Sequence, residues 1–251
     1  MTISAANPGP DAVTRALAYP YQIPKNSYVL SAHGHRHLAV GEPAPDLEGL
    51  HPVVASGSNQ SPEQLARKFD DNHFGHADGA PIPVLRSRME NFDSVYSPHF
   101  SAYGSIAATL HFSSGVSSDL FTTWLTDPQL QRMHDTEALG LNYDFCRLDG
   151  IRIEIDGIGE RDAVFAYIGR RGALSYDNQP VALADIAARG RTWPAMTQTQ
   201  VQTMARDRLA PGLGLQEFIG ENIADVDIRH QRTTCLASDA VPFSHCGFTP
   251  L

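Results

Sequence analysis

The chain has 251 residues, of which 42% are hydrophobic and 19% charged, which suits one large folded domain and argues against a highly charged disordered chain. Its formal net charge of -9 argues against nucleic acid or an anionic membrane as the main partner. The three cysteines, Cys146, Cys235 and Cys246, include no CxxC pair and do not suggest a disulfide framework.

The sequence shows no membrane or export signal. No apolar run approaches the ~18 residues of a transmembrane helix. The stretch from Met1 to Pro10 is polar and small and lacks the charged-then-apolar pattern of a signal peptide. We therefore expect a soluble, cytoplasmic protein with no membrane partner.

Residues 1–50 are rich in Pro, Gly and His and predict an irregular N-terminal arm with one short strand over 28–30. His33, His35 and His37 alternate as on one face of an extended segment, and His73 and His76 have a spacing that can suit a metal. No Cys or carboxylate pattern accompanies either group, so solvated histidines are the expected state. We predict no metal site and no cofactor.

The first motif is an apolar run that stops at a small-residue turn and restarts as a helix. Val53–Ala55 predicts a buried strand, and Gly57-Ser58-Asn59 the turn. Ser61 is a good N-cap, Pro62 suits the first helical turn, and Gln64 stands in the capping-box position. A loop delivered onto a helix N-terminus offers free N–H groups, which suit a carboxylate or an oxyanion.

The middle of the chain predicts several short strands, an α+β pattern without strict βαβ alternation. Ser113–Ser118 is expected to be a turn, Asp149-Gly150 a hairpin turn, and Tyr103-Gly104-Ser105 a strand-connecting turn. The expected strands are 95–100, 107–112, 120–125, 143–148, 151–155 and 163–168.

A second capped helix starts at Thr126 and runs to about Leu139. Leu130, Met133 and Glu137 fall at i, i+3 and i+7, so Glu137 continues the apolar face of this helix. A carboxylate on the buried side is paired, hydrogen-bonded or chemically active. Two alternatives stay open: an ion pair with Arg147 or another basic neighbour, or a catalytic acid and base.

The last third of the chain predicts helices over 182–189, 198–209 and 215–223, followed by an irregular segment from about His230. We expect three parts. These are the arm (1–50), a central domain (51–175) and a C-terminal helical extension packed on it (176–251).

The central segment resembles the γ-glutamylcyclotransferase-like family over roughly Pro52 to Leu174, about half the chain. The resemblance is carried by the turn Ser56-Gly57-Ser58-Asn59, then Ala107-Ala-Thr-Leu, Gly115-Val, Leu120-Phe-Thr-Thr-Trp-Leu-Thr, Met133-His-Asp-Thr-Glu137 and Asn142-Tyr143, in that order. It implies a small mixed β-barrel flanked by helices. It also implies catalysis by Glu137, with Ser56, Gly57, Ser58, Asn59 and Tyr143 binding the substrate. Two departures are Ser56, where the family usually has an aromatic residue, and Met133-His134, where it has Leu-Asp.

The resemblance implies an enzyme that cleaves a γ-glutamyl or similar amide by intramolecular aminolysis, releasing 5-oxoproline and an amine. Other chemistries remain open: an amide hydrolase or acyltransferase on the same fold, a serine hydrolase with a dispersed triad, or a non-catalytic binding or interaction protein. The sequence contains no Gly-x-Ser-x-Gly motif. A cavity between Glu137 and the Ser56–Asn59 loop would favour the enzyme, and an ion pair without a cavity would favour the binding protein.

Overall fold

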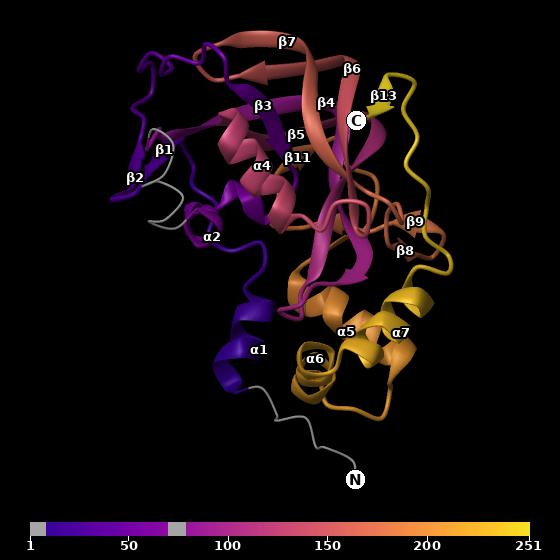
Figure 1. Ribbon diagram of the computed structural model, residues 1–251. Helices are drawn as coiled ribbons and strands as arrows, with labels where there is room; N and C mark the ends of the chain where they lie inside the picture. The colour runs from indigo at the N-terminus through magenta and orange to yellow at the C-terminus, as the bar shows by residue number, and fades with distance from the viewer. Residues whose placement is uncertain (1–8, 70–78) are drawn as a thin grey trace.

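The computed structural model describes residues 9–69 and 79–251, which Figure 1 draws as ribbons. The helices are α1 (Pro10–Leu17), α2 (Pro62–Lys68), α4 (Asp127–Thr136), α5 (Gln198–Leu209), α6 (Leu215–Ala224) and α7 (Val226–Leu236), with a 3-10 turn η1 (Ser58–Gln60). The longer strands are β1 (Tyr28–Ser31), β2 (Gly34–His37), β3 (His51–Ala55), β4 (Ile82–Phe100), β5 (Ile106–Leu125), β6 (Tyr143–Ile155) and β7 (Gly159–Gly169). Short strands are β8 (Ser175–Tyr176), β9 (Gln179–Pro180), β10 (Ala182–Leu183), β11 (Ala188–Arg189), β12 (Ala195–Met196) and β13 (Phe248–Pro250). Within the described ranges, no helix combines the length and apolar character needed to cross a bilayer.

Five strands close into a barrel. β3 pairs antiparallel with β5 and parallel with β7, and the ring continues through β6 and β4 back to β5 by antiparallel pairings. Closure gives each of these strands a partner on both edges, which removes exposed strand edges from the core of the fold. The predicted fold class, an α+β fold with a small mixed barrel flanked by helices, is confirmed.

β4 and β5 are long continuous strands where the sequence predicts shorter ones. Ser113–Ser118 lies inside β5, so the predicted turn is wrong. Asn91 and Gly115 adopt left-handed conformations (φ 62° and 80°), and the Gly115 N–H donates to Asn91 Oδ1 at 2.9 Å. The pairing register shifts between Glu90 and Phe92. The small-residue signal therefore marks a β-bulge that bends the strand pair, and the chain does not reverse there.

The same correction applies to β6, which runs through the predicted Asp149-Gly150 hairpin. Gly150 has φ 66°, and the register with β7 shifts between Asp149 and Ile153. The Asp149 N–H donates to the Gly247 carbonyl oxygen at 2.9 Å, where the C-terminal segment approaches to pair β13 with β6. The C-terminal segment therefore pairs with β6 beside this bulge.

The first fifty residues contain β1 where a short strand was predicted, and they also contain α1 and β2, where the sequence predicted an irregular arm. β1 pairs with β4, so this segment extends the barrel sheet. His35 and His37 share one face of β2, with ring centroids 5.2 Å apart, while His33 lies in the preceding turn. Across the described ranges, no group of three His, Cys, Asp or Glu residues is placed to hold a metal ion. His73 and His76 lie outside those ranges.

The C-terminal part places α5, α6 and α7 together at the end of the barrel where α1 also lies (Figure 1). α5 and α6 occupy the predicted positions. The predicted helix over 182–189 is wrong, because the two ends of this segment form β10 and β11, which pair with β4 and β5, and a turn joins them. The Asp119 N–H on β5 donates to the Ala187 carbonyl oxygen at 2.8 Å. Backbone groups of this segment therefore form hydrogen bonds with the barrel in place of the bonds within a helix.

The irregular segment predicted from His230 is also wrong at its start, since α7 runs from Val226 to Leu236. Asp225 caps this helix by accepting hydrogen bonds from the N–H groups of Asp227 (2.9 Å) and Ile228 (3.0 Å). An Asp at the N-cap satisfies the first free donors of a helix.

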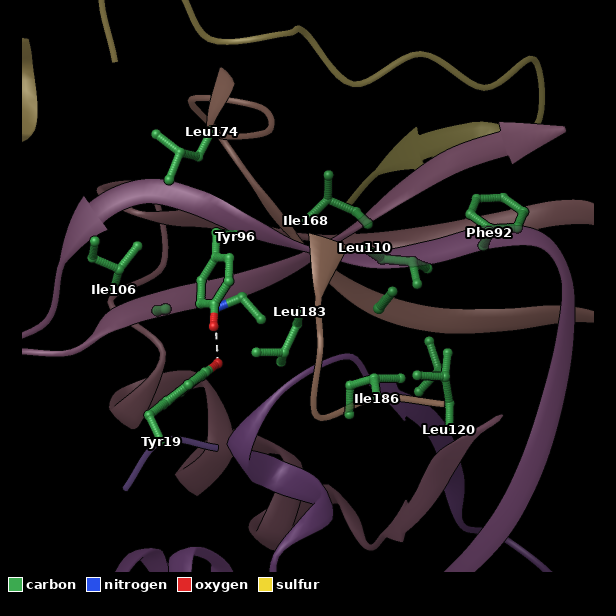
Figure 2. Close-up of a cluster of buried hydrophobic side chains, with 14 of the residues drawn as sticks. Tyr19, Phe92, Tyr96, Ile106, Leu110, Leu120, Ile168, Leu174, Leu183 and Ile186 are labelled. Carbon is green, nitrogen blue, oxygen red and sulfur yellow. Dashed lines mark hydrogen bonds between the residues drawn. The ribbon is translucent and has the colours of Figure 1, made fainter. Parts of the chain in front are cut away.

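Tyr19, between α1 and β1, enters the barrel core. Figure 2 shows its side chain beside Tyr96 among the buried side chains of the barrel. Its ring is buried, and its hydroxyl oxygen accepts a hydrogen bond from the Ala108 N–H on β5 at 2.7 Å. The N-terminal segment is therefore anchored in the barrel by a specific contact.

Candidate active site

The Ser56–Asn59 loop follows β3 and passes into η1. Gly57 lies so close to the Tyr19 hydroxyl that a Cβ atom at this position would overlap Tyr19 Oη and lie 3.0 Å from Ala108 Cβ. The close approach requires glycine, since any side chain would displace Tyr19 or the loop.

The helix after this loop begins without the predicted cap. Pro62 takes the first turn of α2, but the Ser61 side chain makes no capping hydrogen bond, and its buried oxygen has no partner among the described residues. The Ser61 N–H donates to the Ser58 carbonyl oxygen at 2.9 Å, closing η1. A capping box would use that N–H for Gln64, whose side chain instead lines a cavity. The loop therefore meets a 3-10 turn before it meets the α-helix.

Glu137 reaches this loop from the other side. It is the residue at the C-terminal end of α4, directly after Thr136, and its side chain is 12% exposed. Its Oε1 accepts a hydrogen bond from Asn59 Nδ2 at 2.8 Å and another from Lys68 Nζ. Oε2 has no hydrogen bond to the described residues.

A cavity of about 250 Å³ lies between the loop and Glu137. All six residues that the sequence singles out line it: Ser56, Gly57, Ser58, Asn59, Glu137 and Tyr143. Tyr143 presents its ring, because its hydroxyl donates to the Ala108 carbonyl oxygen at 2.8 Å. A cavity was expected for an enzyme, and an ion pair on Glu137 without a cavity for a binding protein. The structure has both the cavity and the ion pair, so this criterion does not separate the two classes.

Lys68 is the charged partner of Glu137. It is the last residue of α2 and its side chain is 9% exposed. The sequence left this partner open as Arg147 or another basic neighbour; Arg147 pairs with Asp149 on β6, and Lys68, which the sequence did not single out, is the neighbour that pairs with Glu137. A basic residue in the last turn of a helix is an ordinary sequence feature, so nothing local distinguished Lys68; the packing of α2 beside α4 places it on Glu137.

Three tyrosines of the lining also escaped the sequence reasoning. Tyr19 comes from the N-terminal segment, Tyr103 from the turn that connects β4 and β5 as predicted, and Tyr167 from β7. The second Tyr-Gly-Ser sequence thus contributes a side chain to the site, although the turn itself connects two strands.

The lining tyrosines are neutral. Burial raises the pKa of Tyr19, Tyr103, Tyr143 and Tyr167 well above the ordinary value, and the negative charge of Glu137 adds to the rise. Lys68 and Glu137 are the charged side chains of the lining. The cavity therefore combines one ion pair with hydroxyl, amide and aromatic groups.

No protein-family model matches the chain, and no curated protein matches it significantly. Among solved structures, the chain is similar to At5g39720.1 from Arabidopsis thaliana, with 18% identity, 49% of this chain and 71% of that chain covered, and a TM-score of 0.36. It is similar to a protein named gamma-glutamyl cyclotransferase, with 13% identity, coverage of 68% and 86%, and a TM-score of 0.37. A third, the uncharacterized protein loc79017 from Homo sapiens, has 11% identity, coverage of 80% and 93%, and a TM-score of 0.39.

Proposed function

We propose that the protein is an enzyme that cleaves a γ-glutamyl or closely similar amide by intramolecular aminolysis, with Glu137 as general base and then general acid. One observation carries the proposal: the Glu137 carboxylate and the Ser56–Asn59 loop face one cavity of about 250 Å³ and are joined through Asn59. The sequence resemblance described above supports the same residues. A cavity of this size suits an amino-acid-sized group and excludes a macromolecule.

In the proposed reaction, the α-amine nitrogen of the substrate attacks its own γ-carbonyl carbon. The new C–N bond closes a five-membered ring, which is favoured because the nucleophile is already attached. Two protons leave the attacking nitrogen and both end on the nitrogen of the leaving amine as its C–N bond breaks. Glu137 carries each proton in turn, and the products are 5-oxoproline and a free amine.

The hydrogen bonds of Glu137 suit this role. Asn59 and Lys68 both bind Oε1, which orients the carboxylate and leaves Oε2 available to exchange a proton with the substrate. The positive charge of Lys68 also disfavours a second cation nearby, so a substrate ammonium would lose its proton more readily.

The test is to incubate the purified protein with a panel of γ-glutamyl amines and γ-glutamyl dipeptides and to detect 5-oxoproline by mass spectrometry. We expect release of 5-oxoproline together with an equal amount of amine. Release of glutamate instead would indicate a hydrolase, and transfer of the acyl group to an added amine would indicate an acyltransferase. Either outcome would overturn the cyclisation.

The Lys68–Glu137 ion pair favours one alternative of a different class, a protein that binds a small zwitterion without changing it. Opposite charges held side by side complement the ammonium and carboxylate of an amino acid. Saturable binding of a panel member by calorimetry, with the ligand recovered intact, would establish this alternative in place of the enzyme.

A further inference from the structure

His99, near the end of β4, is a lining residue with no role in the reaction described so far. Its ring lines the cavity, its exposed fraction is 3%, and it packs edge-on against the ring of Tyr143, with centroids 5.5 Å apart. Its Nδ1 lies 3.0 Å from Ser97 Oγ. One ring nitrogen is therefore held by a buried hydroxyl, and Nε2 is the nitrogen left for the cavity.

The bond to Ser97 decides which nitrogen carries the proton. Ser97 is fully buried, and His99 Nδ1 is the partner of its hydroxyl within the described part of the chain. A buried hydroxyl proton without an acceptor is costly, and a neutral imidazole accepts only at its unprotonated nitrogen. We therefore assign the Ser97 hydroxyl as donor and Nδ1 as acceptor, which places the ring proton on Nε2.

The ring is uncharged at neutral pH. Burial, together with the positive charge of Arg171 acting in the same direction, lowers the pKa of His99 to about 3. An uncharged Nε2–H can donate a hydrogen bond, and it will not exchange its proton with the substrate over the pH range where Glu137 is proposed to act.

Several other donors around the cavity are already engaged. Asn59 Nδ2 and Lys68 Nζ donate to Glu137, and Tyr143 Oη donates to the Ala108 carbonyl oxygen. In the loop, the Ser58 N–H faces the Tyr19 hydroxyl oxygen. This N–H is one of the loop donors that the sequence predicts for an oxyanion. The Nε2–H of His99 adds one more donor to this lining.

We propose that His99 is a catalytic residue whose Nε2–H donates a hydrogen bond to the carbonyl oxygen of the substrate amide and stabilises the oxyanion that forms there. This inference rests on the proposed function. No proton leaves His99 in the reaction, because Glu137 carries both protons. A donor fixed in advance by its hydrogen bond to Ser97 stabilises developing charge without reorganisation.

The activity test compares His99→Phe, which keeps a ring and removes the donor, with His99→Gln, which keeps an N–H donor. We expect His99→Phe to lower kcat about 100-fold, as loss of one oxyanion donor does, and His99→Gln to stay within about tenfold of the parent protein. KM should change less than kcat. Equal kcat values for the parent protein and a folded His99→Phe variant would overturn the proposal.

The second measurement needs no variant and no substrate. Long-range proton–nitrogen NMR on the labelled protein should show His99 protonated at Nε2 only, unchanged across the range in which an ordinary histidine of pKa about 6.5 titrates. Protonation at Nδ1, or titration in that range, would overturn the proposal. If no amide is turned over, the proposed function fails, while the NMR result still decides whether His99 presents a donor.

Discussion

The sequences at the starts of α2 and α4 both predict a capping box, and of these two helices only α4 forms it. At α4, the Gln129 N–H donates to Thr126 Oγ1 (3.3 Å) and the Thr126 N–H donates to Gln129 Oε1 (3.0 Å). At α2, the N–H of Ser61 is already bound within η1, so Gln64 turns to the cavity. A capping signal therefore marks where a helix starts, while the preceding turn decides whether the cap forms.

The other ends of the two helices differ in charge. Lys68 ends α2, where a cation is favoured by the helix dipole, and Glu137 follows α4, where an anion is disfavoured. The two side chains pair across the gap between the helices. The ion pair compensates the unfavourable position of Glu137, so the two helices form one functional unit although their starts differ.

The largest expected effect is at the end of α4. Glu137→Gln keeps size and hydrogen-bonding and removes the basic oxygen, so we expect kcat/KM for 5-oxoproline release to fall about 10³-fold. Asp135→Asn is the matched control, since Asp135 lies on the same helix and accepts a hydrogen bond from Gln131 on the surface. Full turnover in a folded Glu137→Gln protein would remove Glu137 from the mechanism.

The next effect tests the end of α2. Lys68→Met leaves the Glu137 carboxylate buried without its cation, and we expect the free energy of unfolding to fall by about 3 kcal/mol at neutral pH. The double variant with Glu137→Gln should recover part of that loss. Glu63→Gln, which breaks the exposed pair with Arg67 on the same helix, should cost under about 1 kcal/mol.

Urea unfolding of the Lys68, Glu63 and double variants provides these free energies. Equal losses in the free energy of unfolding for Lys68→Met and Glu63→Gln would show that the buried Lys68–Glu137 pair stabilises the protein no more than the exposed Arg67–Glu63 pair does.

A smaller effect is expected in the loop that leads into α2. Gly57→Ala would place a Cβ against Tyr19 Oη, and we expect a loss of about 1–3 kcal/mol in the free energy of unfolding. Tyr19→Phe in the same protein should recover part of it by removing the oxygen. Gly212→Ala is the control, because a Cβ atom at Gly212 would meet nothing within 4 Å. No difference between the two alanine variants in thermal unfolding would contradict the close contact.

The smallest effects test the two helix starts directly. Thr126→Ala removes a working cap and should cost about 1 kcal/mol in the free energy of unfolding. Ser61→Ala removes a buried hydroxyl that has no partner among the described residues, so it should be neutral or slightly stabilising. A Ser61→Ala loss as large as that of Thr126→Ala would mean that Ser61 does cap α2.

Local patterns predicted much of this protein, and the errors have two causes. The capped helix before Glu137, α5, α6 and the Ser56–Asn59 turn follow from residue spacing alone. The predicted turns at 113–118 and 149–150 are bulges, because glycine and small residues mark left-handed backbone whether the chain reverses or bends. The segment predicted as a helix at 182–189 instead forms backbone hydrogen bonds with the barrel strands. Such long-range pairing cannot be predicted from a local pattern.

The α+β class, the loop and the carboxylate that share a cavity depend on periodicity and turn chemistry within short segments, so they can be read from the residues alone. The groups that surround them depend on contacts between distant parts of the chain. Barrel closure brings Tyr19 to Ala108 across 89 residues and Lys68 to Glu137 across 69. Contacts over such separations depend on which strands pair, and that choice is made by the packing of the whole barrel.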